Sequence, residues 1–307
     1  MFIHLLVPLY SRNVGIVVER KMAVDKWYCE TFLPYCAERG WSCDLKPGWP
    51  ADKTTLLALE NKVAVADFPA LLPETKYDPA DLIPKGKWVL QALQSVLEQQ
   101  AMRNYSDHDV VVMIDGSGKI QYDIACSIAD HLDDGDRLVL GYRDDPRKTM
   151  DDKRVDIEKF ENFLVGCKYK IKLRDAQCGC WGFQGAMLSK LPLIAQSYAI
   201  EIDILIAALS INMEPRFIPV TLIPVTTASG AKQTDYDPAE DMKKLLFLCY
   251  RLNIEREQIP FFLDKFLQNK ENSLPESYIT AAKTLPIPSK CPHMEPIIYA
   301  KIEPKSS

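Results

Sequence analysis

A seven-residue stretch near the middle of the chain constrains the fold more than any other feature. Residues 109–115 read Asp-Val-Val-Val-Met-Ile-Asp, so a mostly β-branched apolar run is bounded by one acid at each end. Such a run is typical of a strand buried on both faces, as the inner strands of a parallel sheet are. A helical pattern over 123–132 and a second apolar strand over 137–143 follow it. Strand, helix and strand in this order predict a βαβ unit, and therefore an α/β fold with a mostly parallel, Rossmann-like central sheet flanked by helices.

The rest of the chain agrees with this class. We expect a buried strand at 3–7, a helix at 14–39 that stops at Gly40, and a short strand at 41–45. The other expected elements are a helix at 54–61, a strand at 62–66, a helix beginning at Lys85-Gly86-Lys87, helices at 156–173 and 198–212, a strand at 217–225, and helices at 238–253, 257–269 and 275–284. Residues 67–84, with four prolines, and the charged residues 145–154 are expected to be loops. We expect one domain over 1–255 and, packed on it, a helical extension with a proline-rich tail over 256–307.

Composition excludes several classes of protein. The net charge of −5, with acids and bases interspersed, argues against binding to nucleic acid. No apolar run approaches the roughly 18 residues of a membrane span, and the N-terminus does not resemble a signal peptide. Nine cysteines without a Cys-x-x-Cys pair are typical of reduced thiols, so we expect a cytoplasmic protein. The apolar helices at 241–269 are expected to pack in the core or in a homo-oligomer interface, with a lipid-facing role as the alternative.

The carboxyl end of the best strand is the first candidate site. In open α/β sheets, ligands bind beyond the carboxyl ends of the strands, and here that position is Asp115, followed by Gly116 and Gly118. Asp115 could contact a ribose hydroxyl or a metal ion, or could simply close an Asx-turn. Arg143 ends what we expect to be the neighbouring strand and would project from the same edge of the sheet, where a guanidinium could bind a diphosphate through two hydrogen bonds or could be an ordinary surface arginine.

Weaker candidates flank this pair. Lys85 and Lys87 begin a helix, and helix N-termini favour anions. Trp181 lies in the glycine-rich stretch 175–185, which predicts either a surface against a flat ligand or a tight loop closed by an aromatic side chain. Glu201 and Asp203 stand in an apolar run, where an acid is costly to bury without a partner. Because they are two residues apart on a helix, at most one of them should face a site, and Glu201 could instead be a capping acid.

Taken in order, these segments resemble the second glycosyltransferase family, which has the GT-A fold, and within it the dolichyl-phosphate mannose synthase-like branch. The resemblance spans most of residues 1–255 and is carried by residues 7–13, 85–87 with 92–93, 110–118, 136–143, 175–183, 201–205, and 218–220 or 223–225.

The resemblance implies a GT-A nucleotide-diphospho-sugar transferase that moves a sugar, with inversion, from a UDP- or GDP-sugar to an acceptor. The acceptor class stays open among a lipid phosphate, a glycan and a small molecule. Arg143 would stabilise the leaving diphosphate, and Asp203 or Glu201 would act as the base. The implied donor-binding residues are Pro8, Tyr10, Asp44, Lys87, Asp115, Gly116, Ser117 and Trp181.

One departure from the family pattern bears on the cofactor. The family's Asp-x-Asp motif holds Mg²⁺ or Mn²⁺, but its second acid is replaced here by Ser117, a poorer ligand for a hard cation. Asp115 could hold the metal with water and phosphate, or Lys119, Arg143 or Lys148 could supply the positive charge, or catalysis could be lost. A non-catalytic nucleotide-binding protein is therefore one alternative function. A sugar-1-phosphate nucleotidyltransferase is another, although residues 9–15 contain only one glycine where that class needs a glycine-rich loop.

Overall fold

The computed structural model describes residues 1–9, 14–48, 85–103, 108–148, 150–195, 199–223 and 238–285. The helix expected at 54–61, the strand expected at 62–66 and the loop expected at 67–84 lie outside these residues.

One six-stranded sheet organises the described residues. Its strands are β1 (Phe2–Pro8), β2 (Ser42–Gly48), β3 (Val110–Met113), β4 (Leu138–Arg143), β5 (Trp181–Gln184) and β6 (Arg216–Val220), in the order β2-β1-β3-β5-β4-β6. β1 is parallel to β2 and β3, and β4 is parallel to β6, whereas β5 is antiparallel to both of its neighbours. The predicted α/β class with a mostly parallel sheet is confirmed.

The antiparallel strand β5 is the main departure from the predicted elements. It lies in the glycine-rich stretch that we expected to be a loop or a ligand-facing surface. A side chain at Gly182 would place its Cβ 2.5 Å from Cγ2 of Ile128. The glycine therefore allows the helix Ile124–Asp133, which contains Ile128, to pack directly on the strand. Because β5 separates β3 from β4, the strands that carry Asp115 and Arg143 are not neighbours.

The helices follow the predicted periodicity closely. They are α1 (Val14–Trp27), a π-helical turn (Tyr28–Phe32), α2 (Leu33–Glu38), α5 (Lys85–Arg103), α6 (Ile124–Asp133), α7 (Asp152–Tyr169), α8 (Ile200–Ser210), α9 (Pro238–Leu252), α10 (Ile259–Leu267) and α11 (Glu276–Lys283). The first three form the continuous helical segment expected at 14–39, and Gly40 follows with φ 66°. Part of the loop expected at 145–154 is helical, because a 3-10 turn spans Pro146–Lys148 and the Asp151 side chain caps α7 at the backbone N–H of Lys153.

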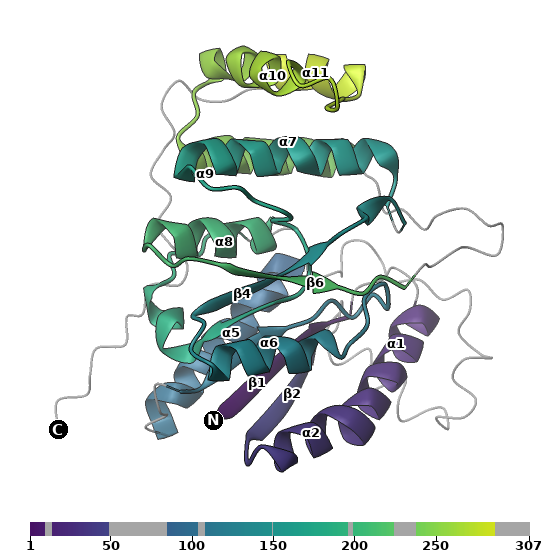
Figure 1. The fold of residues 1–307 in the computed structure, drawn as a ribbon, viewed down its shortest axis with the longest axis vertical. Helices are drawn as coiled ribbons and strands as arrows, with labels where there is room; N and C mark the ends of the chain where they lie inside the picture. Colours follow the sequence, from purple (N-terminus) through teal and green to yellow (C-terminus); the bar gives the residue numbers. More distant parts are fainter. Residues whose placement is uncertain are drawn as a thin grey trace.

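Helices cover both faces of the sheet, and each face has its own core. Alternate residues of β1 point to opposite sides: Leu5 and Val7 pack with α6 residues such as Ile128, and Leu6 packs with α5 residues such as Leu93. On the second face, α8, then α7 with α9, and then α10 with α11 form successive layers (Figure 1).

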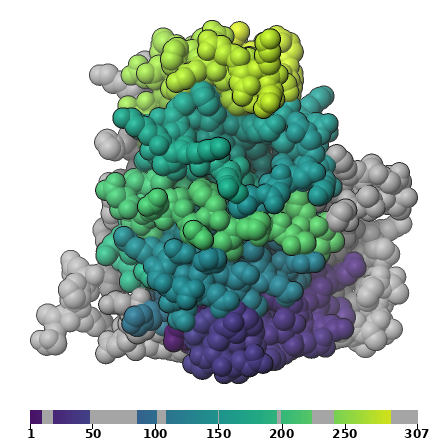
Figure 2. Space-filling model, viewed as in Figure 1, coloured from purple at the N-terminus to yellow at the C-terminus, as the bar shows by residue number. Residues whose placement is uncertain are grey.

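The last helices share the larger core. Leu263, Phe266 and Tyr278 belong to the same cluster of buried side chains as Phe160 and Leu245. Figure 2 shows α10 and α11, in yellow-green, at the opposite end of the molecule from the purple N-terminal segments. None of the helices in the described residues is long and apolar enough to cross a membrane.

Candidate functional site

Asp115 lies two residues beyond the end of β3, on a turn that its own side chain closes. Its Oδ1 accepts a hydrogen bond of 3.0 Å from the backbone N–H of Ser117, and the Ser117 hydroxyl accepts one of 3.4 Å from the backbone N–H of Lys119. Gly118 follows with φ +75°, a conformation that favours glycine. The Asp115 side chain remains 32% exposed. The Asx-turn and an accessible carboxylate, which we considered as alternatives, therefore occur together.

Two close backbone approaches hold this turn in place. The N–H of Gly116 donates to the carbonyl of Pro8 at 3.2 Å, and a Cβ on Gly116 would lie 2.6 Å from Cδ2 of Leu9. On the other side, a Cβ on Gly179 would lie 2.7 Å from the Cβ of Asp115. Pro8 and Gly116 thus position the acid through their backbones, and the turn lies between the end of β1 and the segment that precedes β5.

Lys85 is the charged partner that the fold brings to Asp115. Its Nζ lies 2.5 Å from Oε1 of Glu201 and 3.9 Å from Oδ2 of Asp115. Burial by itself would lower the pKa of Lys85, but the two carboxylates outweigh it, and the pKa is raised. Burial would likewise raise the pKa of Asp115, but Lys85 and the Ser117 N–H outweigh it, and the pKa is lowered. Both groups therefore carry their charges at neutral pH.

Two further cations act on Asp115 from other elements. Lys119, in the following turn, and Arg20, on α1, both lower its pKa. Burial and the charge of Asp115 raise the pKa of the partly buried Tyr122, and this ring lies 5.5 Å from that of Trp27 on α1. The carboxyl edge of β3 is thus surrounded by α1, α5 and α8, and its charged groups favour an anionic ligand.

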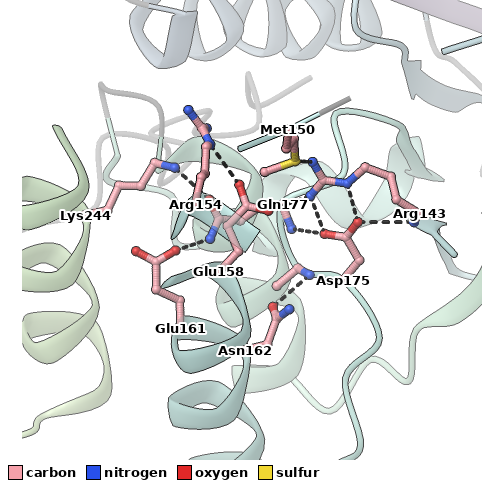
Figure 3. A network of polar contacts seen from close by, with 10 residues as sticks. Arg143, Met150, Arg154, Glu158, Glu161, Asn162, Asp175, Gln177 and Lys244 are labelled. Atoms are coloured by element: carbon pink, nitrogen blue, oxygen red, sulfur yellow. Dashed lines mark hydrogen bonds and ion pairs between the residues drawn. The ribbon is translucent and has the colours of Figure 1, made fainter. Parts of the chain in front are cut away.

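Arg143 lies in a different cluster, shown in Figure 3. Its Nε donates to Oδ2 of Asp175 at 2.6 Å, and one terminal nitrogen donates to Oδ1 of Asp175 and to Oε2 of Glu158, each at 2.8 Å. Arg154 binds the other oxygen of Glu158 at 3.2 Å. Arg143 is not among the charges that act most strongly on Asp115. The Arg143 guanidinium is thus already bound by two buried carboxylates, and its role at the leaving diphosphate stays a prediction.

Asp203 is a buried acid with partners at both oxygens, and its role as a base stays a prediction. Its side chain is 0% exposed and forms an ion pair with Arg251, with 2.7 Å between Oδ1 and Nε. Its Oδ2 accepts hydrogen bonds of 2.7 and 2.8 Å from the backbone N–H groups of Ile194 and Ala195. Glu201 is the acid of this helix that faces the site, and its carboxylate is paired with Lys85.

Two other expected donor-binding residues lie away from the site. Trp181 is 1% exposed, and its ring stacks on Phe183 at 5.4 Å between centroids, so it belongs to the core. Asp44 lies within β2, four residues before its end, where its carboxylate binds Nδ1 of His4 at 3.1 Å and Nζ of Lys46 at 3.2 Å.

Of the two lysines that begin α5, Lys85 is buried and Lys87 is exposed. Tyr10 lies outside the described residues. The resemblance implies donor binding by Lys87, whereas the structure places Lys85 beside Asp115. The helical period could have predicted that Lys85 is buried, because it lies on the same face as the buried Val89 and Leu93, four and eight residues further on.

The described residues around Asp115 do not fit a bound divalent metal. One Asp115 oxygen accepts from a backbone N–H, and the other faces the ammonium of Lys85. The second acid of the motif is absent, and the Ser117 hydroxyl already accepts from Lys119. Among the described residues, no group of three His, Cys, Asp or Glu side chains could hold a metal ion.

Comparison with known proteins gives structural similarity only. No protein-family model matches the chain, and neither does any curated protein. Among solved structures, the chain is similar to glucosyl-3-phosphoglycerate synthase from Mycobacterium tuberculosis. The TM-score is 0.47 at 15% identity for its complex with UDP, over 82% of this chain and 80% of that chain. It is 0.45 at 17% identity, with the same coverage, for the complex with Mn²⁺, UDP-glucose and phosphoglyceric acid.

These structures are not dolichyl-phosphate mannose synthases, and no family model supports that branch, so the comparisons do not support the finer assignment. We therefore base the function on the residues of this chain.

Proposed function

We propose that the protein is a GT-A glycosyltransferase that uses a UDP- or GDP-sugar as donor. The observation that carries this proposal is the surroundings of Asp115: a partly exposed acid at the carboxyl edge of a parallel strand, on a glycine turn, with Lys85, Lys119 and Arg20 acting on it. Such an acid can accept a hydrogen bond from a ribose hydroxyl, while the cations attract a diphosphate. The order of the sequence motifs supports the same reading.

In this reaction the acceptor oxygen attacks the anomeric carbon and forms the new C–O bond. The bond from that carbon to the diphosphate breaks, and the nucleoside diphosphate leaves with the electron pair. A single displacement inverts the configuration at the anomeric carbon. Because negative charge grows on the leaving diphosphate, cations placed there beforehand lower the barrier.

The pairing of the acids favours an acceptor that is already ionised. Asp203 is fully buried, and Glu201 is bound to Lys85, so neither is placed to remove a proton from a hydroxyl group. A phosphate oxygen carries no proton that must be removed before it attacks. We therefore propose a phosphate-bearing acceptor, such as a lipid phosphate or a small phosphorylated molecule.

The proposed function is tested by incubating the protein with a panel of UDP- and GDP-sugars and measuring released nucleoside diphosphate, with and without phosphate-bearing acceptors. Asp115→Asn should weaken donor binding, measured by calorimetry, by about tenfold, because it removes a charge-assisted hydrogen bond. Asp133→Asn, an exposed acid at the end of α6, is the control and should bind like the wild type. If no nucleotide binds and none is released, the glycosyltransferase assignment is wrong.

A non-catalytic nucleotide-binding protein is the second candidate. Two observations favour it: Ser117 stands where the motif has an acid, and the carboxylate of Glu201 is paired with Lys85. The same assay separates the two functions. Tight binding of a nucleotide sugar without release of nucleoside diphosphate, under every acceptor and metal condition, would select the non-catalytic protein.

A further inference from the structure

We propose that Lys85, Lys119 and Arg20 take the place of a divalent cation at this site, so that the donor diphosphate binds without metal. This inference rests on the proposed function and specifies how its donor is held.

Among the described residues, Asp115 is the one carboxylate at this edge that is left for a metal. Ser117 stands in the position of the second acid, and its hydroxyl accepts from the Lys119 N–H. Glu201, a second described acid at this edge, lies 2.5 Å from Nζ of Lys85. Mg²⁺ and Mn²⁺ sites against phosphates depend on carboxylate oxygens to neutralise the ion. Asp115 supplies one such group.

A cation that belongs to the protein already lies beside Asp115. The Lys85 ammonium lies 3.9 Å from Oδ2 of Asp115 and is buried between the two acids. Because those carboxylates raise its pKa, it stays protonated near neutral pH. A dication on the same Asp115 oxygen would meet a fixed positive charge at short range, in a partly buried setting where screening is weak.

The other two cations, Lys119 and Arg20, belong to segments that hydrogen bonds hold in place. The carbonyl of Lys119 accepts from the N–H of Ile223 at 2.8 Å, and the next residue, Ile120, forms a bridge with Leu222. Arg20 belongs to α1, which is joined to the same segment by a 2.8 Å hydrogen bond from Nε1 of Trp27 to Asp123. Lys85, Lys119 and Arg20 all act on the carboxylate of Asp115. Positive charge gathered at this edge favours a bound diphosphate.

The test is calorimetric titration of the whole chain with UDP and with GDP, first in EDTA and then with Mn²⁺ or Mg²⁺. We expect at least one nucleotide to bind with an affinity that differs by less than about threefold between these conditions. Electron paramagnetic resonance of Mn²⁺ with the same nucleotide should show no protein-bound ion. Binding should weaken as salt rises, because salt screens the charges that hold the ligand.

The variants Lys119→Gln and Arg20→Gln should each lower the metal-free affinity by about tenfold, since each removes one charged contact. Lys190→Gln is the matched control: an exposed lysine that follows β5 at the opposite edge of the sheet and should bind like the wild type. Circular dichroism and thermal melts establish that each variant is folded.

The outcomes separate this inference from the function on which it rests. Binding that appears only with Mn²⁺ or Mg²⁺, or a protein-bound Mn²⁺ signal in the presence of nucleotide, would overturn the inference and leave the glycosyltransferase proposal standing. Metal-free binding that neither Lys119→Gln nor Arg20→Gln weakens would overturn it as well. Failure of every nucleotide to bind in both conditions would refute the inference together with the proposed function.

Discussion

At the scale of single residues, Lys85 shows how a charge can be buried and remain ionised. Its ammonium lies between Glu201 and Asp115, and only 9% of its side chain is exposed. Removing a charge from water costs several kcal/mol, and here two carboxylates offset that cost. The interaction joins the start of α5 to the first turn of α8 and to the turn after β3. Lys85 therefore connects these three segments of the chain.

We expect Lys85→Met to destabilise the protein by about 3–5 kcal/mol, because it leaves the buried carboxylate of Glu201 without a partner. Urea denaturation followed by circular dichroism measures this change. Lys87→Met, two residues along the same helix but exposed, should change stability by no more than about 0.5 kcal/mol. Equal effects of the two substitutions would contradict the pairing described for Lys85.

Glu161 is a second buried ionisable group, within the network of Figure 3. It lies on α7, is fully buried and accepts a hydrogen bond from Nε2 of Gln177, whose Oε1 accepts from Lys244 at 2.7 Å. Burial raises the pKa of Glu161 from 4.5 to about 7; Lys244 opposes the rise, and Asp241 and Glu158 add to it. The folded protein thus retains a proton that the unfolded chain releases.

Stability should consequently fall as the pH rises from about 4.5 to about 7, because the folded state binds more protons than the unfolded chain in that window. The contribution of this one residue is on the order of 1–3 kcal/mol. Glu161→Gln should gain stability relative to the wild type as the pH increases, which urea denaturation at several pH values would measure. Glu257→Gln, an exposed control, should run parallel to the wild type at every pH. A parallel curve for Glu161→Gln would refute the raised pKa.

At the scale of elements, β5 decides how the sheet is assembled. It has only four residues, pairs antiparallel with β3 and β4, and its Gly182 lies directly beneath α6. Local sequence did not predict this strand, because four residues are too few to show a strand period and Gly182 weakens the strand signal of Trp181 and Phe183. The two flanking strands supply the hydrogen bonds that stabilise it. The longer helices were predictable, because their apolar period extends over many residues.

Gly182→Ala should destabilise the protein by about 1–3 kcal/mol, because the added methyl would meet Cγ2 of Ile128, Cδ1 of Leu132 and the carbonyl of Val111. The double variant with Ile128→Ala should cost less than the sum of the two single changes, by at least about 0.5 kcal/mol, since one substitution makes room for the other. Denaturant unfolding of the four proteins provides the cycle. Strict additivity would show that α6 does not press on β5.

At the scale of the whole molecule, the helices after residue 255 close the larger core. Phe266 on α10 packs against Phe160 and Phe163 of α7, with ring centroids 5.2 and 5.5 Å apart. Tyr278 of α11 contacts the same Phe160 ring at 6.4 Å. Since these aromatic side chains share one cluster with α8 and α9, we expect the described helices to unfold with the sheet.

Phe266→Ala should therefore lower the stability of the entire protein by about 3–5 kcal/mol. Calorimetry should still show a single transition, shifted to lower temperature. Phe261→Ala on the same helix, where the ring is 61% exposed, should have a much smaller effect. A separate early transition of the C-terminal helices would indicate an independent domain after residue 255.

The sequence by itself determined the class of the fold and the place of Asp115. Strand and helix periods are local properties of the chain, and the carboxyl end of an inner strand follows from them directly. Only the tertiary structure decided which charges meet. Arg143 binds Asp175, Lys85 binds Glu201, and Asp203 binds Arg251 across long stretches of chain. Those pairings depend on the order of the strands, which the inserted β5 sets through contacts between distant segments. Burial then makes each pairing necessary, because a charge removed from water needs a partner that local sequence does not name.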